Sequence, residues 1–489
     1  MRLRGIISVS FALLCCSTVL GQNDFRKEFD EYSKSNMAEF KNFEEKNNAE
    51  FAETLKNNWE KFQATQGKIR LNKPKPRIMP KYENTAEVSD EEINVSNAEK
   101  TLSSKDTEAA VAPVRIGSAK NPHNRLKTIC FDFYGVGQRV DVPEEYGTFH
   151  LKGISEHNVS TFWKHLADYP FASILESFYE SERDLHLNDW AASEWVASLS
   201  QVLYPDNIHT EQEVFSVFFL NQLGLSAKIA RVENRLVRLF ASVQQIYARP
   251  FIDIGDTLWY PFHGDFGDSD VFTYRQSFVL PTRPFDMRLN TPIDIGTESD
   301  MRYVAKQSKT FGCEMKVPIN AELMKFYAGY PQMDVQIYAD AEPSTVFNEA
   351  ILEALSERVR EKGERDAVNA ILAFLQKDFK YATDDEQFGY EKPFFCEENF
   401  IFDCNDCEDR AILMSRLVRS ILGLKVVLLE YQDHIAVAVR FKEEMHGDYF
   451  IHDGSNYYIC DPTYIGAPAG ECMPIYKSQT AKIIELQQF

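Results

Sequence analysis

The apolar positions at the start of the chain form one short unbroken run. Residues 6–20 are apolar apart from small residues and two cysteines, with two arginines before them and polar sequence from Gln22 onward. This pattern is typical of a signal peptide over residues 1–21. The run is shorter than the ~20 residues that a membrane-spanning helix needs, and no later stretch is long and apolar enough. We therefore expect an exported protein without a transmembrane segment, located in the periplasm or cell envelope or secreted.

The two cysteines in this run, Cys15 and Cys16, raise the alternative of a lipoprotein signal. No small residue precedes either of them, and Leu14 stands before the first. Lipid attachment is therefore the less favoured interpretation.

An 11-residue repeat follows the signal peptide. Eleven residues are close to three helical turns, so residues at this spacing share one face of a helix. Gly and Pro are absent between Asn23 and Thr65, which predicts one amphipathic helix over residues 22–65. We interpret its aromatic stripe as a packing face, either against the rest of the chain or for self-association. Mixed charge on the polar side disfavours the alternative of a membrane-surface helix. The repeating aromatic residues are Phe29, Phe40, Phe51 and Phe62.

The periodic pattern stops after the predicted helix. Residues 66–125 are rich in Ser, Asn, Glu, Lys and Pro, which predicts a disordered linker. The chain of 489 residues is long enough for two to four domains. We expect an α+β domain over 126–262, a β-rich connecting domain over 263–343 with a strand at 335–339, and an α+β domain over 344–489.

Two segments of these domains share one pattern. Residues 215–230 and 411–429 each read as an apolar helix, a Leu-Gly-Leu stop and a strand. Aligning Gly224 with Gly423 suggests that residues 126–262 are a degenerate copy of the C-terminal domain. The alternative is that helix, glycine and strand form a common unit that arose twice.

Composition limits the classes of partner and the compartment. The net charge is −21, and no stripe of Lys and Arg is present, which excludes a nucleic-acid partner. Removal of the signal peptide leaves seven cysteines, so an oxidising compartment leaves at least one thiol unpaired. Cys396 with Cys404 and Cys460 with Cys472 are plausible local disulfides, although the sequence does not determine the pairing.

Candidate chemistry is concentrated between residues 402 and 464. Residues 409–422 have helical periodicity and end at Gly423, which places Cys407 at the start of the helix. There the helix dipole would stabilise a thiolate, and the backbone N–H of Cys407 could form part of an oxyanion hole. His434 opens a later strand and Asp461 ends another. The three residues form a workable nucleophile, base and orienting acid.

Three motifs around these residues, DCEDRA, DHIAVAV and ICDPTY, resemble the Cys, His and Asp motifs of the transglutaminase-like superfamily. That superfamily includes transglutaminases, bacterial transglutaminase-like cysteine proteinases and related amidases, and the similarity covers residues 368–468. The resemblance implies an α+β, papain-like domain in which the helix carrying the cysteine packs on an antiparallel sheet. It further implies that Cys407 is the nucleophile, His434 the general base and acid, and Asp461 the residue that orients the histidine. The whole chain is also similar to exported proteins of Bacteroidetes that share an aromatic helix repeat and this domain.

The predicted function is hydrolysis of a peptide or carboxamide bond in a protein or peptide substrate, through a thioester intermediate, without a required cofactor. One alternative is a crosslinking transglutaminase, and another is a non-catalytic scaffold or binding protein of the envelope. Cys407 could instead pair with Cys404, and His446 and His452 are rival histidines. In the aligned copy, Ile208 and Arg235 stand at the positions of Cys407 and His434, so that copy would be inactive.

The acids that flank the nucleophile give a second candidate site. Asp406, Glu408 and Asp409 resemble the calcium ligands of some bacterial proteinases in this superfamily, and oxygen ligands suit calcium. The alternative is that they are ordinary acids of a helix N-terminus. Gln387 is the candidate side chain for stabilising an oxyanion.

Overall fold

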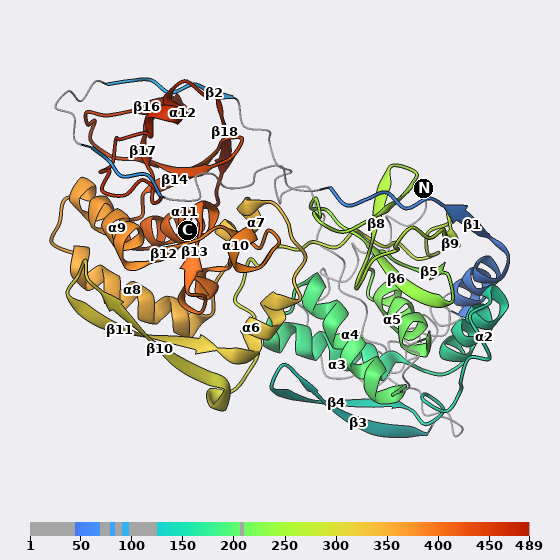
Figure 1. Cartoon of the computed structure of the whole chain (residues 1–489). Helices are drawn as coiled ribbons and strands as arrows, with labels where there is room; N and C mark the ends of the chain where they lie inside the picture. The colour runs from blue at the N-terminus through green and yellow to red at the C-terminus, as the bar shows by residue number, and fades with distance from the viewer. Residues whose placement is uncertain (1–44, 69–78, 84–89, 97–124, 206–209, 489) are drawn as a thin grey trace, which may run out of the picture.

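The computed structural model of the chain describes residues 45–68, 79–83, 90–96, 125–205 and 210–488. The predicted signal peptide at 1–21 and the first half of the aromatic repeat lie outside these residues. The fold is α+β, as predicted, and it contains two six-stranded sheets, each with its own set of helices (Figure 1). Within the described residues, every helix is too short or too polar to cross a lipid bilayer.

The first unit contains the helix over residues 45–57, the β3–β4 hairpin, the helices α2 to α5 and a sheet in the order β1-β9-β5-β6-β8-β7. Its helices and hairpin are β3 (Leu126–Phe133), β4 (Val136–Pro143), α2 (Glu156–Ala167), α3 (Ala172–Leu185), α4 (Asp189–Leu203) and α5 (Thr210–Gln222). Its sheet strands are β1 (Trp59–Phe62), β5 (Ala227–Val232), β6 (Arg235–Ala241), β7 (Ile252–Ile254), β8 (Thr257–Pro261) and β9 (Val271–Tyr274).

The second unit begins with the β10–β11 hairpin, continues through helices, and ends in a sheet in the order β16-β17-β15-β14-β18-β2. Before the sheet come η1 (Glu298–Asp300), β10 (Met301–Ser308), β11 (Cys313–Asn320), α6 (Ala321–Ala328), α7 (Val335–Asp340), α8 (Thr345–Val359), α9 (Glu364–Asp378), β12 (Lys380–Tyr381), α10 (Asp384–Gln387), η2 (Cys396–Phe400), β13 (Cys404–Asn405), α11 (Cys407–Leu417) and the π-helical turn η3 (Val418–Leu422). The sheet and its last helix are β2 (Val95–Ser96), β14 (Lys425–Glu430), β15 (Ile435–Arg440), β16 (Tyr449–His452), β17 (Ser455–Cys460), α12 (Pro474–Lys477) and β18 (Ala481–Glu485).

The two sheets have the same strand order and the same chain connections. In each, an early strand (β1 or β2) lies at one edge beside the last strand (β9 or β18), and the central hairpin follows a buried helix. The alignment of Gly224 with Gly423 carries the hairpin pair Ala227–Phe240 onto Val426–Val439. Both glycines adopt positive φ, 79° and 62°, where glycine ends a helix without steric cost. One pairing differs, because β1 runs antiparallel to β9 whereas β2 runs parallel to β18.

The predicted helix over residues 22–65 is wrong beyond Asn57. Residues 45–57 are helical, but Trp59–Phe62 form strand β1, which pairs with β9. Phe51 packs against Trp163 in one core, while Phe62 lies in the core on the other face of the sheet. Helical periodicity is a local signal, and the unpaired edge of β9 offers hydrogen bonds that outweigh it.

Two further boundaries differ from the prediction. Residues 79–83 and 90–96, expected to belong to a disordered linker, pack on the second unit, where Met79 and Ile93 are buried. The strand expected at 335–339 is helix α7. Five of its six residues are buried, so a strand and a helix cannot be told apart there from the spacing of apolar positions. The region 263–343 contributes a hairpin and two helices to the second unit rather than a separate β-rich domain.

Candidate active site

Cys407 is the first residue of α11, and the acids around it form the helix cap. The Oδ1 atom of Asp406 accepts hydrogen bonds from the backbone N–H groups of Glu408 at 3.1 Å and Asp409 at 3.5 Å. Asp409 returns the contact, accepting from the Asp406 N–H at 3.1 Å. This reciprocal capping fixes the start of the helix at Cys407.

His434 lies in the tight turn between β14 and β15. Its carbonyl accepts from the Tyr431 N–H at 2.8 Å, and β15 begins at the next residue. The imidazole stacks on the ring of Tyr476, with centroids 4.8 Å apart and planes inclined by 17°. The ring orientation is therefore set by the turn and by an aromatic platform from α12.

Asp461 directly follows β17, the strand that pairs with β15. Its Oδ2 lies 2.7 Å from the His434 Nε2, while its Oδ1 accepts from the Thr463 N–H at 2.8 Å. The Asp461 backbone carbonyl accepts from the side chain of Gln376 at 3.1 Å. These contacts fix the carboxylate and leave the His434 Nδ1, which has no hydrogen-bond partner in the described part of the chain, as the nitrogen able to receive a proton.

The start of β15 also brings the thiol to this histidine. The backbone N–H of Ile435, next to His434, donates to the thiol of Cys407. Helix α11 packs on β15 and β14, so helix start, turn and strand end converge at one place. The structure thus brings together the three residues that the motifs singled out.

Both rival histidines pair with acids instead. His446 contacts Asp90 at 3.1 Å with its side chain 87% exposed, and His452 contacts Glu485 at 3.1 Å. The seven cysteines among the described residues are free thiols, so the Cys396–Cys404 and Cys460–Cys472 bridges are not formed there, and Cys407 is not paired with Cys404.

The environment of Cys407 opposes ionisation of its thiol. Only 2% of Cys407 is exposed, and this burial, followed by the neighbouring carboxylates of Asp406 and Glu408, raises the pKa of its thiol well above the usual value. The expectation that the helix start would stabilise a thiolate is therefore not met. A helix dipole acts like about half a positive charge at the helix start. Its stabilisation of a thiolate is smaller than the combined destabilisation by burial and by the adjacent acids.

A cluster of buried carboxylates lies next to the thiol. Oxygen atoms of Asp384, Glu391 and Asp406 lie within 4.8 Å of one another. Burial and the charges of Asp409 and Glu408 raise the pKa of Asp384 to about 10. Of the predicted metal ligands, Asp406 belongs to this cluster, whereas both oxygens of Asp409 accept backbone hydrogen bonds, from Phe394 at 2.9 Å and from Asp406.

Two members of this cluster, Asp384 and Glu391, are not among the predicted metal ligands. Both belong to the acidic stretch DDEQFGYEK, in which Gln387 was the predicted site residue. The high density of acidic residues in that stretch was the signal that could have indicated a cation site. The Oδ1 of Asp384 and the Oδ2 of Asp406 are buried and, among the described residues, lack hydrogen-bond partners.

Gln387 ends the short helix α10, and its amide donates to the carbonyl of Ala382 at 3.3 Å. A different side chain stands near the thiol. Tyr381 in β12 pairs in register with Asn405 in β13, two residues before the nucleophile. Burial, followed by the charges of Cys407 and Asp406, raises the pKa of the Tyr381 phenol, so it is a neutral hydrogen-bond donor beside the site.

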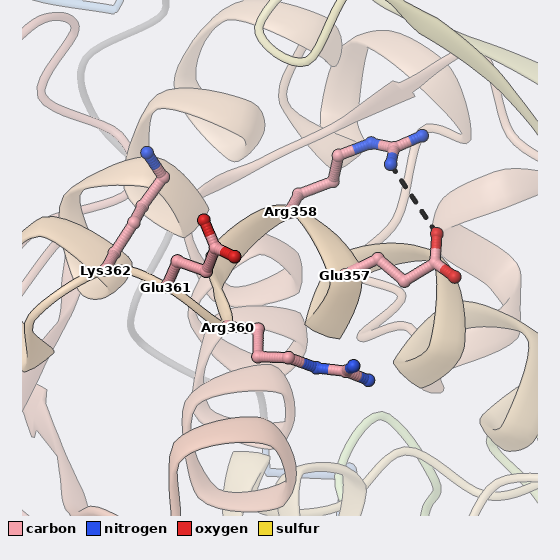
Figure 2. A pocket seen from close by; sticks show the side chains of 5 residues that line it. All are labelled: Glu357, Arg358, Arg360, Glu361 and Lys362. Atoms are coloured by element: carbon pink, nitrogen blue, oxygen red, sulfur yellow. Dashed lines mark ion pairs between the residues drawn. The ribbon is translucent and has the colours of Figure 1, made fainter.

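A separate hollow on the surface has a different character. Figure 2 shows it at the end of α8, where five charged residues line it and Arg358 pairs with Glu357 at 3.6 Å. None of the candidate catalytic residues belongs to it. The lining residues are Glu357, Arg358, Arg360, Glu361 and Lys362.

Neither protein-family models, nor curated proteins, nor solved structures give a significant match to this chain. The chemistry is therefore argued from the three motifs and from the geometry of Cys407, His434 and Asp461.

Proposed function

We propose that this chain is an exported thiol enzyme of the transglutaminase-like type that hydrolyses a peptide or carboxamide bond. The observation that carries the proposal is the 2.7 Å contact between the His434 Nε2 and Asp461, made at the strand whose first N–H donates to the Cys407 thiol. A buried His–Asp pair beside a buried Cys has no evident structural need, whereas nucleophilic catalysis needs all three residues.

In the proposed reaction, the His434 Nδ1 accepts the proton of the Cys407 thiol as the sulfur attacks the substrate carbonyl carbon. The tetrahedral intermediate collapses with cleavage of the C–N bond, and His434 gives the proton to the departing amine or ammonia. Water, deprotonated by His434, then attacks the thioester. The products are a carboxylic acid and the regenerated thiol.

Two donors are placed to stabilise the oxyanion. The backbone N–H of Cys407 is at the first helical position, where intrahelical acceptors are lacking. The phenol of Tyr381 is the second donor that we propose, in place of Gln387. Removing one such donor from comparable enzymes lowers the rate about 10²–10³-fold.

Calcium is the cation that the carboxylate cluster fits. Asp384, Glu391 and Asp406 supply oxygen ligands at close range, and two of the oxygens are buried without a donor among the described residues. A divalent cation held there would neutralise the negative charge beside Cys407 and so lower the pKa of its thiol. Asp384, Glu391 and Asp406 would act only as ligands of this cation.

We further propose that the first unit is a non-catalytic copy. Its sheet has the same strand order as the second, and Arg235 occupies the position of His434 at the start of the second hairpin strand. Ile208, which aligns with Cys407, lies outside the described residues. An arginine does not serve as a general base near neutral pH, because its pKa is above 12.

The proposal is tested by iodoacetamide labelling of the full chain, with mass-spectrometric mapping of each cysteine, alongside turnover of a peptide library. We expect labelling of Cys407 to depend on His434, so that His434→Ala abolishes it, and we expect Cys407→Ala to abolish library cleavage. His452→Ala, at the other rival histidine, is the matched control and should leave both unchanged, because His452 pairs with Glu485 and not with Asp461. Absence of turnover with labelling independent of His434 would favour the scaffold alternative, and incorporation of an added primary amine would favour the crosslinking alternative.

A further inference from the structure

Residues 79–83 lie extended beside the loop that carries Asp461. The Ile465 N–H donates to the Pro80 carbonyl, and the Tyr82 N–H donates to the Ile465 carbonyl, both at 2.9 Å. These two bonds are the pattern of a parallel strand pair, with Lys81 opposite Ile465. A backbone segment from early in the chain thus pairs with the protein four residues after Asp461.

The side chains of this segment enter the region around the triad. Arg410, in the first turn of α11, donates to the Met79 Sδ at 2.9 Å, and Met79 is only 7% exposed. The same guanidinium stacks over the ring of Tyr381 at 5.5 Å. Tyr82 packs edge-on against Tyr464, with centroids 5.6 Å apart. Met79 therefore fits beside the helix that bears Cys407, and Tyr82 fits on the loop that follows Asp461.

Residues 90–96 continue along the other side of the site. Glu91 pairs with Lys477 at 3.1 Å, and Lys477 follows Tyr476, the ring on which the His434 imidazole stacks. Val95 and Ser96 then pair with β18. In Figure 1 these two blue segments lie on the red C-terminal sheet, away from the remaining blue part of the chain in the first unit. We call residues 79–83 and 90–96 the strap.

The triad is closed to solvent. Cys407, His434 and Asp461 are each at most 2% exposed, so a substrate cannot reach the sulfur in this arrangement. Ile93 anchors residues 90–96 in a core of the second unit, whereas residues 79–83 are held by two backbone bonds and by the side chains of Met79 and Tyr82. Release of residues 79–83 alone breaks few interactions and is therefore energetically accessible.

We infer that residues 79–83 occupy the substrate-binding edge of the candidate enzyme and hold it inactive, and that its substrate is an extended peptide taking the same place. The inference rests on the proposed function. The strap indicates the peptide chemistry: backbone pairing with Ile465, an unbranched apolar side chain against Arg410, and an aromatic ring three residues further on against Tyr464.

The test uses the full chain and the rate of iodoacetamide labelling at Cys407. We expect Met79→Arg, which places a second cation beside Arg410, and Tyr82→Ala each to speed this labelling about tenfold or more by opening the site. Lys81→Ala is the matched control, because the Lys81 side chain is exposed and the backbone pairing is retained. Labelling of buried Cys396 should stay slow in all variants, which distinguishes local opening from unfolding.

Adding a synthetic peptide of residues 79–83 to Met79→Arg or Tyr82→Ala should restore slow labelling. Equal labelling rates in the wild type and both strap variants, or no effect of the peptide on variants that label faster, would overturn the inference. Faster labelling without peptide cleavage would support the strap and refute the proposed function. Peptide cleavage together with equal labelling rates in the wild type and the strap variants would support the proposed function and refute the inference about the strap.

Discussion

Glu397 shows at the scale of one residue how burial controls protonation. The side chain is fully buried, and its Oε1 accepts from the Ser344 N–H at 2.7 Å. Burial raises its pKa to about 7 from an ordinary value of 4.5. Between these values the folded state retains a proton that the unfolded state releases. The contribution of protonated Glu397 to the free energy of unfolding is therefore complete below about pH 4.5 and is lost as the pH rises through 7.

Replacing this carboxyl by an amide removes the titration while keeping an oxygen acceptor for Ser344. We expect Glu397→Gln to raise the free energy of unfolding by about 3 kcal/mol at pH 8 and to change it little at pH 4. Urea denaturation at the two pH values measures this difference. A gain of the same size at both would show that Glu397 is not the titrating group.

Asp461 acts through the imidazole that it contacts. Without its carboxylate, the His434 ring loses the partner that selects its tautomer and stabilises its protonated form. We expect Asp461→Ala to slow both Cys407 alkylation and any turnover by about 10²–10⁴-fold. Second-order alkylation rates measure this, with His452→Ala as the control. An unchanged rate in Asp461→Ala would remove Asp461 from the proposed triad.

At the scale of elements, a buried ion pair joins α7 to the turn that ends the nucleophile helix. Arg419 in η3 donates to the Asp340 Oδ1 at 2.9 Å and to the Gln487 carbonyl at 2.6 Å, and the two side chains are at most 9% exposed. Removing one partner leaves a buried charge, which costs about 3–5 kcal/mol. The pair therefore fixes the C-terminal end of the chain to α7 and to the helix carrying Cys407.

We expect Arg419→Met to destabilise the protein by about that amount and Arg419→Met with Asp340→Asn to recover a substantial part. A double-mutant cycle by chemical denaturation gives the coupling energy. If the two single changes are additive, the pair does not couple these elements.

The carboxylate cluster links α10 and the following loop to the cap of α11. Millimolar calcium should raise the melting temperature by a few degrees, because binding to the folded state alone stabilises it. Asp384→Asn should abolish this response, and a chelator should reverse it in the wild type. Asp453→Asn, in the separate group formed by His452, Asp453 and Glu485, is the control. A calcium response that survives Asp384→Asn would place the cation elsewhere.

At the scale of the whole molecule, one hydrophobic core runs through both units. Trp190 and Tyr330 pack with ring centroids 6.0 Å apart, Tyr134 packs on Phe326 at 5.6 Å, and Asn188 donates to the Tyr330 hydroxyl at 2.6 Å. Each of these contacts joins the first unit to the second. We therefore expect the two units to unfold together as one cooperative structure.

Calorimetry should accordingly show a single unfolding transition. Trp190→Ala should lower its midpoint without splitting it, at a cost of about 3–5 kcal/mol typical of a large buried aromatic residue. Two resolved transitions in the wild-type protein would contradict this shared core.

The sequence by itself determined the α+β character and indicated where the candidate site lies. A helix from near Cys407 to Gly423, strands after it and a turn at Asp461 follow from local periodicity and from glycine and proline, and these signals are strong where apolar residues alternate regularly. The same local signals misplaced the end of the aromatic helix and the strand at 335–339.

Only the tertiary structure decided which distant residues meet. Trp59–Phe62 form an edge strand, residues 79–83 and 90–96 lie on the second unit, and Asp384 and Glu391 join Asp406. All of these are pairings across long stretches of chain. The raised pKa of Cys407 has the same origin, because burial and neighbouring charge depend on what packs around the thiol. Local periodicity carries no information on these contacts, since hydrogen bonds at a sheet edge and desolvation in a core arise only once the chain has folded.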